Sequence, residues 1–361
     1  MKTSYIKEEL SRGKDFIESI EEDSNALIVS HSDVDGLISA SIISQLLEEE
    51  GIEKQSQMFL LDRGEEVKKR ILNKTEELDA DSIIFLDYTP PKDTYEGLDD
   101  RDVLTIEHHP VREVPDHGVF VNPQEGEPPA ASVLCHMLYK QMEGEKDTKP
   151  WALMGTYSDM MLDQGLEHLE LNEEEKELYL HNGVMNWNLQ TIIQLVNVSY
   201  IDKKESSKIF KLIKESIEKE NPLLIEEESR GRAKQIMEKK RKAEKEKIET
   251  LERNSNLEVD KEARLVFVEF SSDLRIKRIL ANHLRTRHPG YTIAIAMKKT
   301  GKYSMSVRSS TADLSKAVPK ACEGIDAHGG GHPGAAGATV NENDPSKFIE
   351  NLKEELKKQK K

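Results

Sequence analysis

The sequence predicts an α/β protein in which a parallel-sheet domain comes first, a helical insertion or linker follows, and a smaller α/β domain comes last. Short apolar runs typical of buried strands alternate with segments whose apolar residues recur at helical spacing. This alternation stops after residue 170 and resumes near residue 261. A chain of 361 residues is also too long for one ordinary domain. We therefore expect domains at 1–170 and 261–361, joined by a helical linker or arm at 171–260.

Composition describes an acidic protein with an ordinary core. The formal net charge is −16, one third of the residues are charged, and 5% are aromatic. No apolar run approaches the length of a membrane span, and the N-terminus does not resemble a secretory signal, so we expect a cytoplasmic protein with no membrane partner. The two cysteines, Cys135 and Cys322, are far apart and suggest neither a disulfide framework nor a thiolate metal site.

The negative charge bears on possible nucleic-acid partners. Coating a duplex through charge alone requires many lysine and arginine contacts to phosphate, which this acidic balance disfavours. A nuclease remains compatible with it. An active site that holds divalent cations is itself rich in carboxylates, and the cations then supply the positive charge.

The elements of the first domain are expected to follow one another along the chain. We expect a lead-in helix at 3–20, strands at 26–29, 55–61, 82–86 and 103–106, helices at 37–47 and 65–78, and two further helices at 131–142 and 151–161. Alternation of this kind predicts parallel strands, whose carboxyl ends meet at one edge of the sheet, where ligands bind. Ligand-type side chains at several strand ends would therefore lie close together.

The first strand delivers three such side chains in alternation. His31, Asp33 and Asp35 follow the apolar run and precede Gly36. Residues two apart on an extended segment point to the same side, so the three can converge if the extension persists to the turn. The plainer interpretation is that an aspartate after a buried strand caps the turn or the following helix, which is its commoner role.

Two more strand ends and one helix carry similar residues. Asp87 follows the buried run SIIFL, and the short strand after it leads into Glu107, His108 and His109. Asp159 lies in the second of the two late helices, and pattern alone gives it the weakest support. Each of these residues taken singly could serve a turn or a cap. Independent turn chemistry would rarely place ligand-type residues at the ends of several strands of one sheet.

Together these residues suggest a metal site. The candidate set is His31, Asp33, Asp35, Asp87, His108, His109 and Asp159. Carboxylate and imidazole donors without thiolate suit Mn²⁺ or Mg²⁺, with Zn²⁺ less favoured. At least four carboxylates exceed the need of one such ion. Two ions roughly 3.5–4 Å apart, sharing a carboxylate, would use them and form a phosphoryl-transfer site.

The middle of the chain differs in kind. Its last stretch, 226–253, holds ten Lys or Arg and eight Glu, which predicts a solvated helix or helical arm. The apolar residues within it are too sparse for a long coiled coil. We leave two alternatives open: an arm that contacts a partner or a second copy of the chain, or a spacer.

The last domain has its own candidate site. Its expected elements are strands at 265–270, 291–296 and 302–307 and helices at 274–284 and 345–361. Arg308 and Ser309 follow the third strand, and a glycine-rich stretch at 327–340 contains Gly330, Gly331 and His332. Glycines let backbone amides approach an anion, the histidine can donate to it, and the arginine offers bidentate phosphate binding. A flexible loop and a surface ion pair are the plainer alternatives, and the stretch is no Walker loop because no Lys-Ser or Lys-Thr follows.

These motifs together resemble the DHH phosphoesterase superfamily, in the branch that carries a DHHA1 domain. HSDVDG is similar to its first motif, the Asp87 strand to its second, Glu107-His108-His109 to its signature triplet, and GTYSDM with Asp159 to its fourth. VRSS and GGGHPGAAG resemble the DHHA1 substrate-binding motifs. The resemblance covers residues 20–165 and 262–345 and leaves out the helical middle.

The resemblance implies a Mn²⁺-dependent phosphodiesterase with two ions, Mg²⁺ being the alternative, and a nucleotide held by the second domain across a cleft. Matching positions imply that Asp33, Asp35, Asp87, His108 and Asp159 are metal ligands, with Asp87 as a bridge and His31 as a further ligand. His109 then lies near the scissile phosphate and stabilises the transition state, while Arg308 and His332 bind phosphate. The triplet begins with Glu107 where the family has Asp. If that acid orients a histidine, Glu could serve with its extra methylene.

Within the superfamily the layout resembles the archaeal RecJ-like exonucleases. The first hypothesis is therefore a single-strand-specific exonuclease on DNA or RNA that releases nucleoside 5′-monophosphates, with a link to DNA repair or replication proteins. The alternatives are a phosphodiesterase of short oligonucleotides or cyclic dinucleotides, which the low aromatic content supports, and a catalytically silent replisome scaffold. Pyrophosphatase relatives are disfavoured because the GGGH motif belongs to the other type of second domain.

Overall fold

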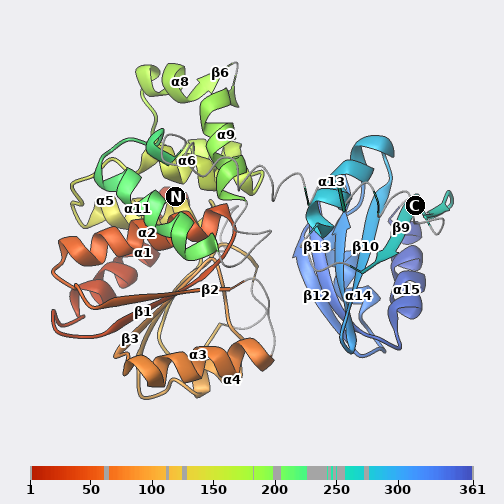
Figure 1. Cartoon of the computed structure of the whole chain (residues 1–361), viewed down its shortest axis with the longest axis horizontal. Coiled ribbons are helices and arrows are strands. Elements are labelled where there is room, and N and C mark those ends of the chain that lie inside the picture. The colour runs from red at the N-terminus through yellow and green to blue at the C-terminus, as the bar shows by residue number, and fades with distance from the viewer. Residues whose placement is uncertain are drawn as a thin grey trace. The chain divides into compact units, whose positions relative to one another are not determined.

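The computed structural model describes residues 2–60, 65–110, 114–123, 128–181, 183–197, 205–225, 242, 245–246, 249, 257–271 and 276–359. The chain divides into two compact units, Met1–Ile236 and Met237–Lys361 (Figure 1). Much of the charged stretch predicted as an arm, 226–253, lies outside the described residues. In the part of the chain that is described, no helix combines the length and apolar character that crossing a bilayer requires.

The first unit is built on a parallel sheet in the order β2-β1-β3-β4-β5. Its strands are β1 (Ala26–His31), β2 (Gln55–Leu60), β3 (Ser82–Leu86), β4 (Asp102–Ile106) and β5 (Val119–Val121). The predicted parallel α/β sheet is confirmed, and β5 is a strand that the sequence pattern did not reveal. Three residues are too short a run for periodicity to distinguish from a loop.

Helices cover both faces of this sheet (Figure 1). On one side lie α1 (Lys2–Glu18), α2 (Val34–Glu49), α5 (Ala131–Gln141) and α6 (Lys149–Ser158), and on the other lie α3 (Glu65–Leu78) and α4 (Lys92–Glu96). Alternate residues of β1 supply the two cores, since Ile28 belongs to the first and Leu27 and Val29 to the second. The sheet is thus buried on both faces, which explains its continuous apolar runs.

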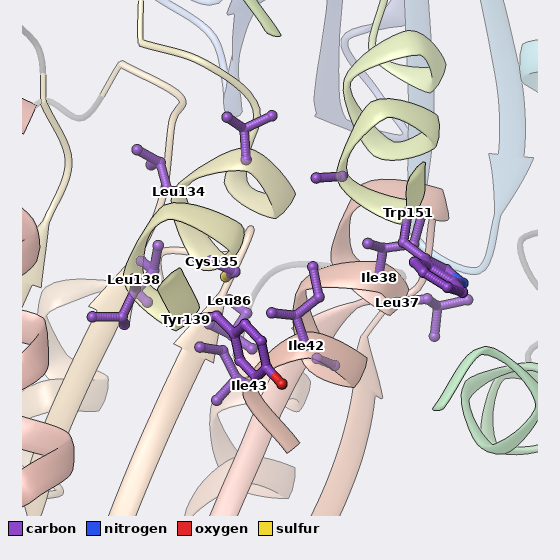
Figure 2. Close-up of a cluster of buried hydrophobic side chains, with 14 of the residues drawn as sticks. Leu37, Ile38, Ile42, Ile43, Leu86, Leu134, Cys135, Leu138, Tyr139 and Trp151 are labelled. Carbon is purple, nitrogen blue, oxygen red and sulfur yellow. The ribbon is translucent and has the colours of Figure 1, made fainter. Parts of the chain in front are cut away.

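The larger core fixes α2 behind the carboxyl end of β1. Figure 2 shows Leu37, Ile38, Ile42 and Ile43 of α2 facing Leu86 of β3 and the side chains of α5 and α6. The α5 and α6 members labelled there are Leu134, Cys135, Leu138, Tyr139 and Trp151. All of these side chains are at most 1% exposed, so α2 is a central helix and its first turn cannot move independently.

The segment after the sheet is mostly helical but is not a free arm. It contains α7 (Leu162–Leu169), α8 (Glu173–Tyr179), a small hairpin of β6 (Leu180–His181) and β7 (Val184–Met185), α9 (Trp187–Val196) and α11 (Ser206–Glu218). Helix α11 packs on α2 and β2, and its Ile213 and Ile217 are fully buried in the first core. Residues 206–225 therefore belong to the first unit.

The second unit is a mixed sheet in the order β12-β13-β11-β10-β9-β8. Its strands are β8 (Glu258–Asp260), β9 (Leu265–Phe270), β10 (Thr292–Lys299), β11 (Lys302–Arg308), β12 (Ala327–His332) and β13 (Ala335–Asn341), and its helices are α13 (Lys277–Arg287), α14 (Leu314–Ala321) and α15 (Pro345–Lys358). Strands β9 and β10 pair in parallel, and the other neighbours in this sheet are antiparallel. Helices α14 and α15 pack on one face, and α13 lies against β10 and β11.

The glycine-rich stretch forms two paired strands and is not the flexible loop that was its plainer interpretation. Gly329, Gly330 and Gly331 lie in β12 and pair with Ala338, Gly337 and Ala336 of β13. A Cβ added at Gly329 would come within 2.6 Å of the Ala338 Cβ, so this glycine permits close packing. Composition suggested flexibility here because glycine is rare in strands, and the long-range pairing overrides that preference.

Candidate metal centre

The junction between β1 and α2 brings its three predicted residues together, though by a different geometry from the one expected. The strand ends at His31, and α2 begins at Val34, so Asp35 is in the first helical turn. Asp33 is the N-cap of α2, and its carboxylate accepts a hydrogen bond from the Gly36 amide at 3.2 Å. The helix starts early because the Asp33 carboxylate accepts from an amide of the first turn, which offsets the low helix propensity of Val34, Asp35 and Gly36.

Asp35 does not cap its own helix. Its two carboxylate oxygens accept hydrogen bonds from the backbone amides of Ala131 and Ser132 at 2.9 and 3.1 Å, at the N-terminus of α5. Gly155 of α6 makes room for it, because a Cβ there would lie 2.6 Å from Asp35 Oδ1 and 2.1 Å from Ser132 Oγ. Sequence reasoning missed these amides. The one available signal was the glycine that opens GTYSD.

Asp87 follows β3 directly and lies at the centre of the site. Asp87 is 2% exposed. Its backbone φ of +52° lies in the left-handed region, which is typical of a residue in a turn directly after a strand. Its Oδ1 lies 3.3 Å from His108 Nε2 and its Oδ2 3.7 Å from His31 Nδ1, and among the described residues no contact to either oxygen has good hydrogen-bond geometry. A buried carboxylate left this way is costly unless a cation satisfies it.

His108 joins three aspartates into a first group. Its Nε2 atom is 3.3 Å from Asp87 Oδ1, 3.5 Å from Asp159 Oδ2 and 3.9 Å from Asp35 Oδ2. These separations approach the spacing of about 3 Å between neighbouring ligands of a small divalent cation. Asp159, which pattern supported least, is the C-cap of α6 and reaches this group.

A second group shares one of these aspartates. His31 Nδ1 is 2.8 Å from Asp33 Oδ2 and 3.7 Å from Asp87 Oδ2. Potential ligand atoms of His31, Asp33 and Asp87 lie within 4.8 Å of one another, as do those of Asp35, Asp87, His108 and Asp159. The two oxygens of Asp87 thus face different groups. Four ionised aspartates would carry a charge of −4, which two divalent cations would balance, so the donor set fits a pair of such ions.

Burial and mutual repulsion shift the ionisation of these groups. Burial, with a further contribution from Asp159, raises the pKa of Asp35 to about 7. Burial and the Asp33 carboxylate raise the pKa of Asp87 well above its usual range. For His108, burial opposes the charged form, but Asp159 and Asp87 outweigh it and hold its pKa well above the usual value. Without a cation the site therefore holds protons that a cation would displace.

Glu107 orients His109. Its Oε1 accepts hydrogen bonds from the backbone amides of His108 and His109 and lies 2.7 Å from His109 Nδ1. Asn122 donates to the His109 carbonyl at 2.9 Å, a contact that the sequence motifs did not predict. The side chain of His109 is 29% exposed, whereas that of Glu107 is 1% exposed. The longer acid thus bends back onto its own backbone and leaves the far edge of the His109 ring accessible.

The predicted residues of the second unit lie around one end of its sheet. Arg308 of β11 lies opposite Ala335 of β13, which in turn lies opposite His332 of β12. Two residues earlier on β11, Ser306 forms a second row of the same kind with Gly337 and Gly330. Directly opposed residues of antiparallel strands point to the same face. Arg308, Gly330 and His332 therefore share one face, while Gly331 points to the other. Arg308 Nη1 donates to the Val307 carbonyl at 2.9 Å.

Ser309 has a structural position beside them. Its side chain is buried, its hydroxyl accepts hydrogen bonds from the amides of Thr311 and Ala312, and Thr292 Oγ1 is 3.0 Å away. It shapes the turn after β11, and a direct contact with substrate remains a prediction. In the same unit, Lys277 of α13 donates to Ser304 Oγ at 2.6 Å and to the Met305 carbonyl at 3.2 Å.

Comparisons with known proteins agree with this architecture. The DHH family, N-terminal domain, matches residues 25–162, and the DHHA1 domain matches residues 263–358. None of the curated proteins matches the sequence.

Among solved structures the chain is similar to RecJ from Thermus thermophilus in complex with Mn²⁺, at 16% identity and TM-score 0.68 over 98% of this chain and 55% of that one. It is similar to the DHH domain of a protein described as a member of a family of ribosomal proteins, at 16% identity and TM-score 0.69 over 99% and 92%. It is also similar to exonuclease RecJ bound to manganese, at 17% identity and TM-score 0.61 over 97% and 94%. The chain thus spans about half the length of the Thermus RecJ.

The first unit is an α/β fold with a cluster of carboxylates and imidazoles at the carboxyl ends of its parallel strands, an arrangement typical of metal-dependent phosphoesterases. A DHH domain followed by a DHHA1 domain is the order that the two family matches give. The chain belongs to the DHH/DHHA1 phosphoesterase superfamily and has the RecJ-like fold.

Proposed function

We propose that the chain is a divalent-cation-dependent phosphodiesterase that shortens single-stranded DNA or RNA from an end and releases nucleoside 5′-monophosphates. In this proposal residues 1–170 carry the hydrolytic centre and residues 261–361 hold the substrate phosphates, while the helical segment 171–260, part of which packs in the first unit, joins them. The family supports hydrolysis of phosphate esters. The choice of a single-stranded polynucleotide goes beyond it.

One observation carries the proposal: Asp87 belongs to both groups of potential ligands. Metal ligands in the proposal are His31, Asp33, Asp35, Asp87, His108 and Asp159. A pair of cations held this way would neutralise charge on a phosphodiester and lower the pKa of a water molecule. A scaffold without catalysis has no physical need for four aspartates that oppose one another at close range.

The chain's own residues have distinct tasks in this proposal. The α5 amides hold Asp35 in place, so that it need not reorganise when substrate arrives. Glu107 accepts a hydrogen bond from His109 Nδ1–H, which orients the ring, and in the imidazolium form the remaining Nε2–H can donate to the phosphate and stabilise developing charge. Arg308, with Gly330 and His332, binds a phosphate of the substrate.

Manganese is the preferred cation and magnesium the alternative. The donors are oxygen and imidazole nitrogen, a combination that suits Mn²⁺. Two of the similar structures are of RecJ bound to manganese. The raised pKa values of Asp35 and Asp87 mean that either ion would displace protons as it binds.

A phosphodiesterase acting on short oligonucleotides or cyclic dinucleotides is the second candidate. The face around Arg308 carries Ser306, Gly337 and Gly330, and Tyr303 and Phe348 of the same unit are buried. Few aromatic rings are available there for stacking successive bases of a long strand. The scarcity of stacking rings favours a short substrate, unless phosphate contacts beyond Arg308 hold a longer strand.

The experiment is a side-by-side digestion of end-labelled single-stranded DNA, single-stranded RNA, duplex DNA and cyclic dinucleotides with Mn²⁺, Mg²⁺ or EDTA. We expect stepwise shortening of single strands, release of 5′-monophosphates, and no reaction in EDTA. An Asp87→Asn variant, purified in parallel, excludes a contaminating nuclease. Cleavage of cyclic dinucleotides alone would establish the second candidate, and no cleavage of any phosphodiester would contradict both.

A further inference from the structure

Positive charge is concentrated in one part of the second unit. Residues 274–312 contain no Asp or Glu, although 68 of the 361 residues of the chain are acidic. At that average, 39 residues would hold about seven acids. The same stretch holds nine lysines and arginines: Arg275, Lys277, Arg278, Arg285, Arg287, Lys298, Lys299, Lys302 and Arg308. Such segregation in a chain of net charge −16 indicates a local attraction for anions.

Helix α13 lies within this stretch, and its charges are not explained by helix stability. Arg285 and Arg287 in its last turn do favour the helix, because cations are stabilised near a helix C-terminus. Lys277 and Arg278 occupy its first two positions, where the helix macrodipole disfavours cations. The helix therefore carries more positive charge than its own stability would select.

The Lys277 contact and the strand register place α13 on the face of the sheet that carries Arg308. Lys277 at the start of the helix donates to Ser304 Oγ on β11, and Ser304, Ser306 and Arg308 point to one face. The helix ends at Arg287, and β10 begins at Thr292, next to Ile293, which pairs with Arg308. The basic end of α13 thus lies at the Arg308 end of the sheet.

Beside α13, the sheet surface on this face is formed by small residues with open space above them. A Cβ added at Gly330 would meet no atom within 4 Å, and one added at Gly337 would meet only the Met305 carbonyl oxygen at 3.4 Å. Arg285 is half-buried and Arg287 is exposed, and neither forms an ion pair with any residue that the structure describes. Small residues on this surface and uncommitted guanidiniums beside it suit a chain of phosphates better than a compact ligand.

We propose that the C-terminal end of α13, through Arg285 and Arg287, binds the backbone of a single-stranded polynucleotide beyond the phosphate held at Arg308, and that this contact makes the enzyme prefer long strands over dinucleotides. The inference rests on the proposed function, since it extends the same substrate site. Phosphate contacts carry no sequence information, so the preference is for length and not for base sequence.

The test compares Arg285→Gln/Arg287→Gln with Lys316→Gln/Lys347→Gln in the full-length protein. The control pair removes the same charge from α14 and α15 on the opposite face, where Lys316 and Lys347 are 76% and 60% exposed. Binding of labelled dT and rU strands of about 24 nucleotides, longer than the site of a single binding module, is measured by fluorescence anisotropy in EDTA across a salt series. Hydrolysis of the same strands and of the dinucleotide pdTpdT is measured with Mn²⁺, and thermal unfolding is followed by circular dichroism.

We expect the α13 variant to bind the strands about tenfold more weakly and to show a log–log salt dependence shallower by about 1.4, the value for two lost phosphate contacts. Its hydrolysis of pdTpdT and its unfolding temperature should match the wild type, and the control variant should match in every assay. Equal strand binding and salt dependence in the α13 variant would overturn the inference, as would a wild type that binds no single strand. Wild-type binding without cleavage of either substrate would refute the proposed function. The binding assays would then still show whether Arg285 and Arg287 contact the strand.

Discussion

Asp87 meets the requirements of a ligand shared by two cations. It is buried, its two oxygens face different groups of potential ligands, and the described residues offer those oxygens no hydrogen bond of good geometry. Its backbone φ of +52° is a conformation that Asp and Asn adopt more readily than other non-glycine residues. The position therefore combines an electrostatic cost with a conformational one, a combination common at functional sites.

Asp87→Asn is the sharpest single substitution. Asparagine keeps the size and the left-handed backbone but cannot serve as a bridging anion. We therefore expect kcat/KM to fall by at least about 100-fold, the upper end of the loss seen when residues that only support metal ligands are changed. The metal-free variant should unfold at or above the wild-type temperature, because asparagine replaces a carboxyl group whose ionisation is opposed by burial and by the Asp33 carboxylate. Hydrolysis assays and thermal melts in EDTA measure both. Near-normal activity would rule out a shared ligand.

Gly155→Ala tests whether the close approach of α6 positions Asp35. The new Cβ would lie 2.6 Å from Asp35 Oδ1, so something must shift, and we expect a stability loss of about 1–3 kcal/mol together with weaker Mn²⁺ binding. Gly13→Ala in α1 is the matched control, since its Cβ would meet Val121 Cγ2 at an ordinary 3.4 Å. Calorimetric titration with Mn²⁺ reports the affinity. If both variants bind Mn²⁺ like the wild type, the packing of Gly155 against Asp35 is irrelevant to the site.

At the scale of elements, α5 links the core to the metal centre. Its N-terminal amides hold Asp35, and further along its buried His136 has its Nδ1 atom 2.7 Å from Thr148 Oγ1. Burial, with Lys140 and Lys149 adding to it, lowers the pKa of His136 to about 4. A helix that must stay in place for the site to work thus depends on a neutral histidine.

The consequence is a defined loss of stability in acid. Because the folded pKa of His136 lies below the unfolded value of 6.5, its contribution is fully present above pH 6.5 and is lost as pH falls through 4. The loss amounts to about 3 kcal/mol at the low end. Urea unfolding of the wild type and of His136→Gln at a series of pH values isolates this group from the carboxylates. Parallel pH profiles for the two proteins would show that His136 is protonated without cost.

Elements were predictable where long-range pairing did not override local preference. The helix expected at 65–78 and the strand expected at 82–86 have those bounds in the structure. The glycine-rich strands β12 and β13 were not foreseen, because their stability comes from cross-strand pairing. The burial of Ile213 of α11 against α2 was equally invisible, since a helical pattern does not state its partner.

At the scale of the whole molecule, the sequence was enough for the fold class and for the residues that cluster at the candidate metal centre. His31, Asp33, Asp35, Asp87, His108 and Asp159 could be selected because parallel strands deliver their carboxyl ends to one edge. The backbone amides that hold Asp35 and the orientation of His109 by Glu107 could not, because they depend on three-dimensional packing between distant segments. The assignment of roles to His31, His109 and Arg308 remains a prediction.

Charge is also organised at this scale. Carboxylates gather in the candidate metal centre of the first unit, and the acid-free stretch 274–312 lies in the second. Cations and phosphates interact favourably with these two regions respectively, so a phosphodiester substrate with divalent ions suits both. This segregation is consistent with the proposed action of a chain of net charge −16 on a polyanion.

The most direct test of the central claim is the anomalous diffraction of crystals of the wild type grown with Mn²⁺. We predict two manganese peaks in the first unit, one bounded by Asp35, Asp87, His108 and Asp159 and the other by His31, Asp33 and Asp87, with an oxygen of Asp87 on each ion. The same crystals of Asp87→Asn should lose at least one peak. A single wild-type ion, or two ions that do not both contact Asp87, would contradict the account.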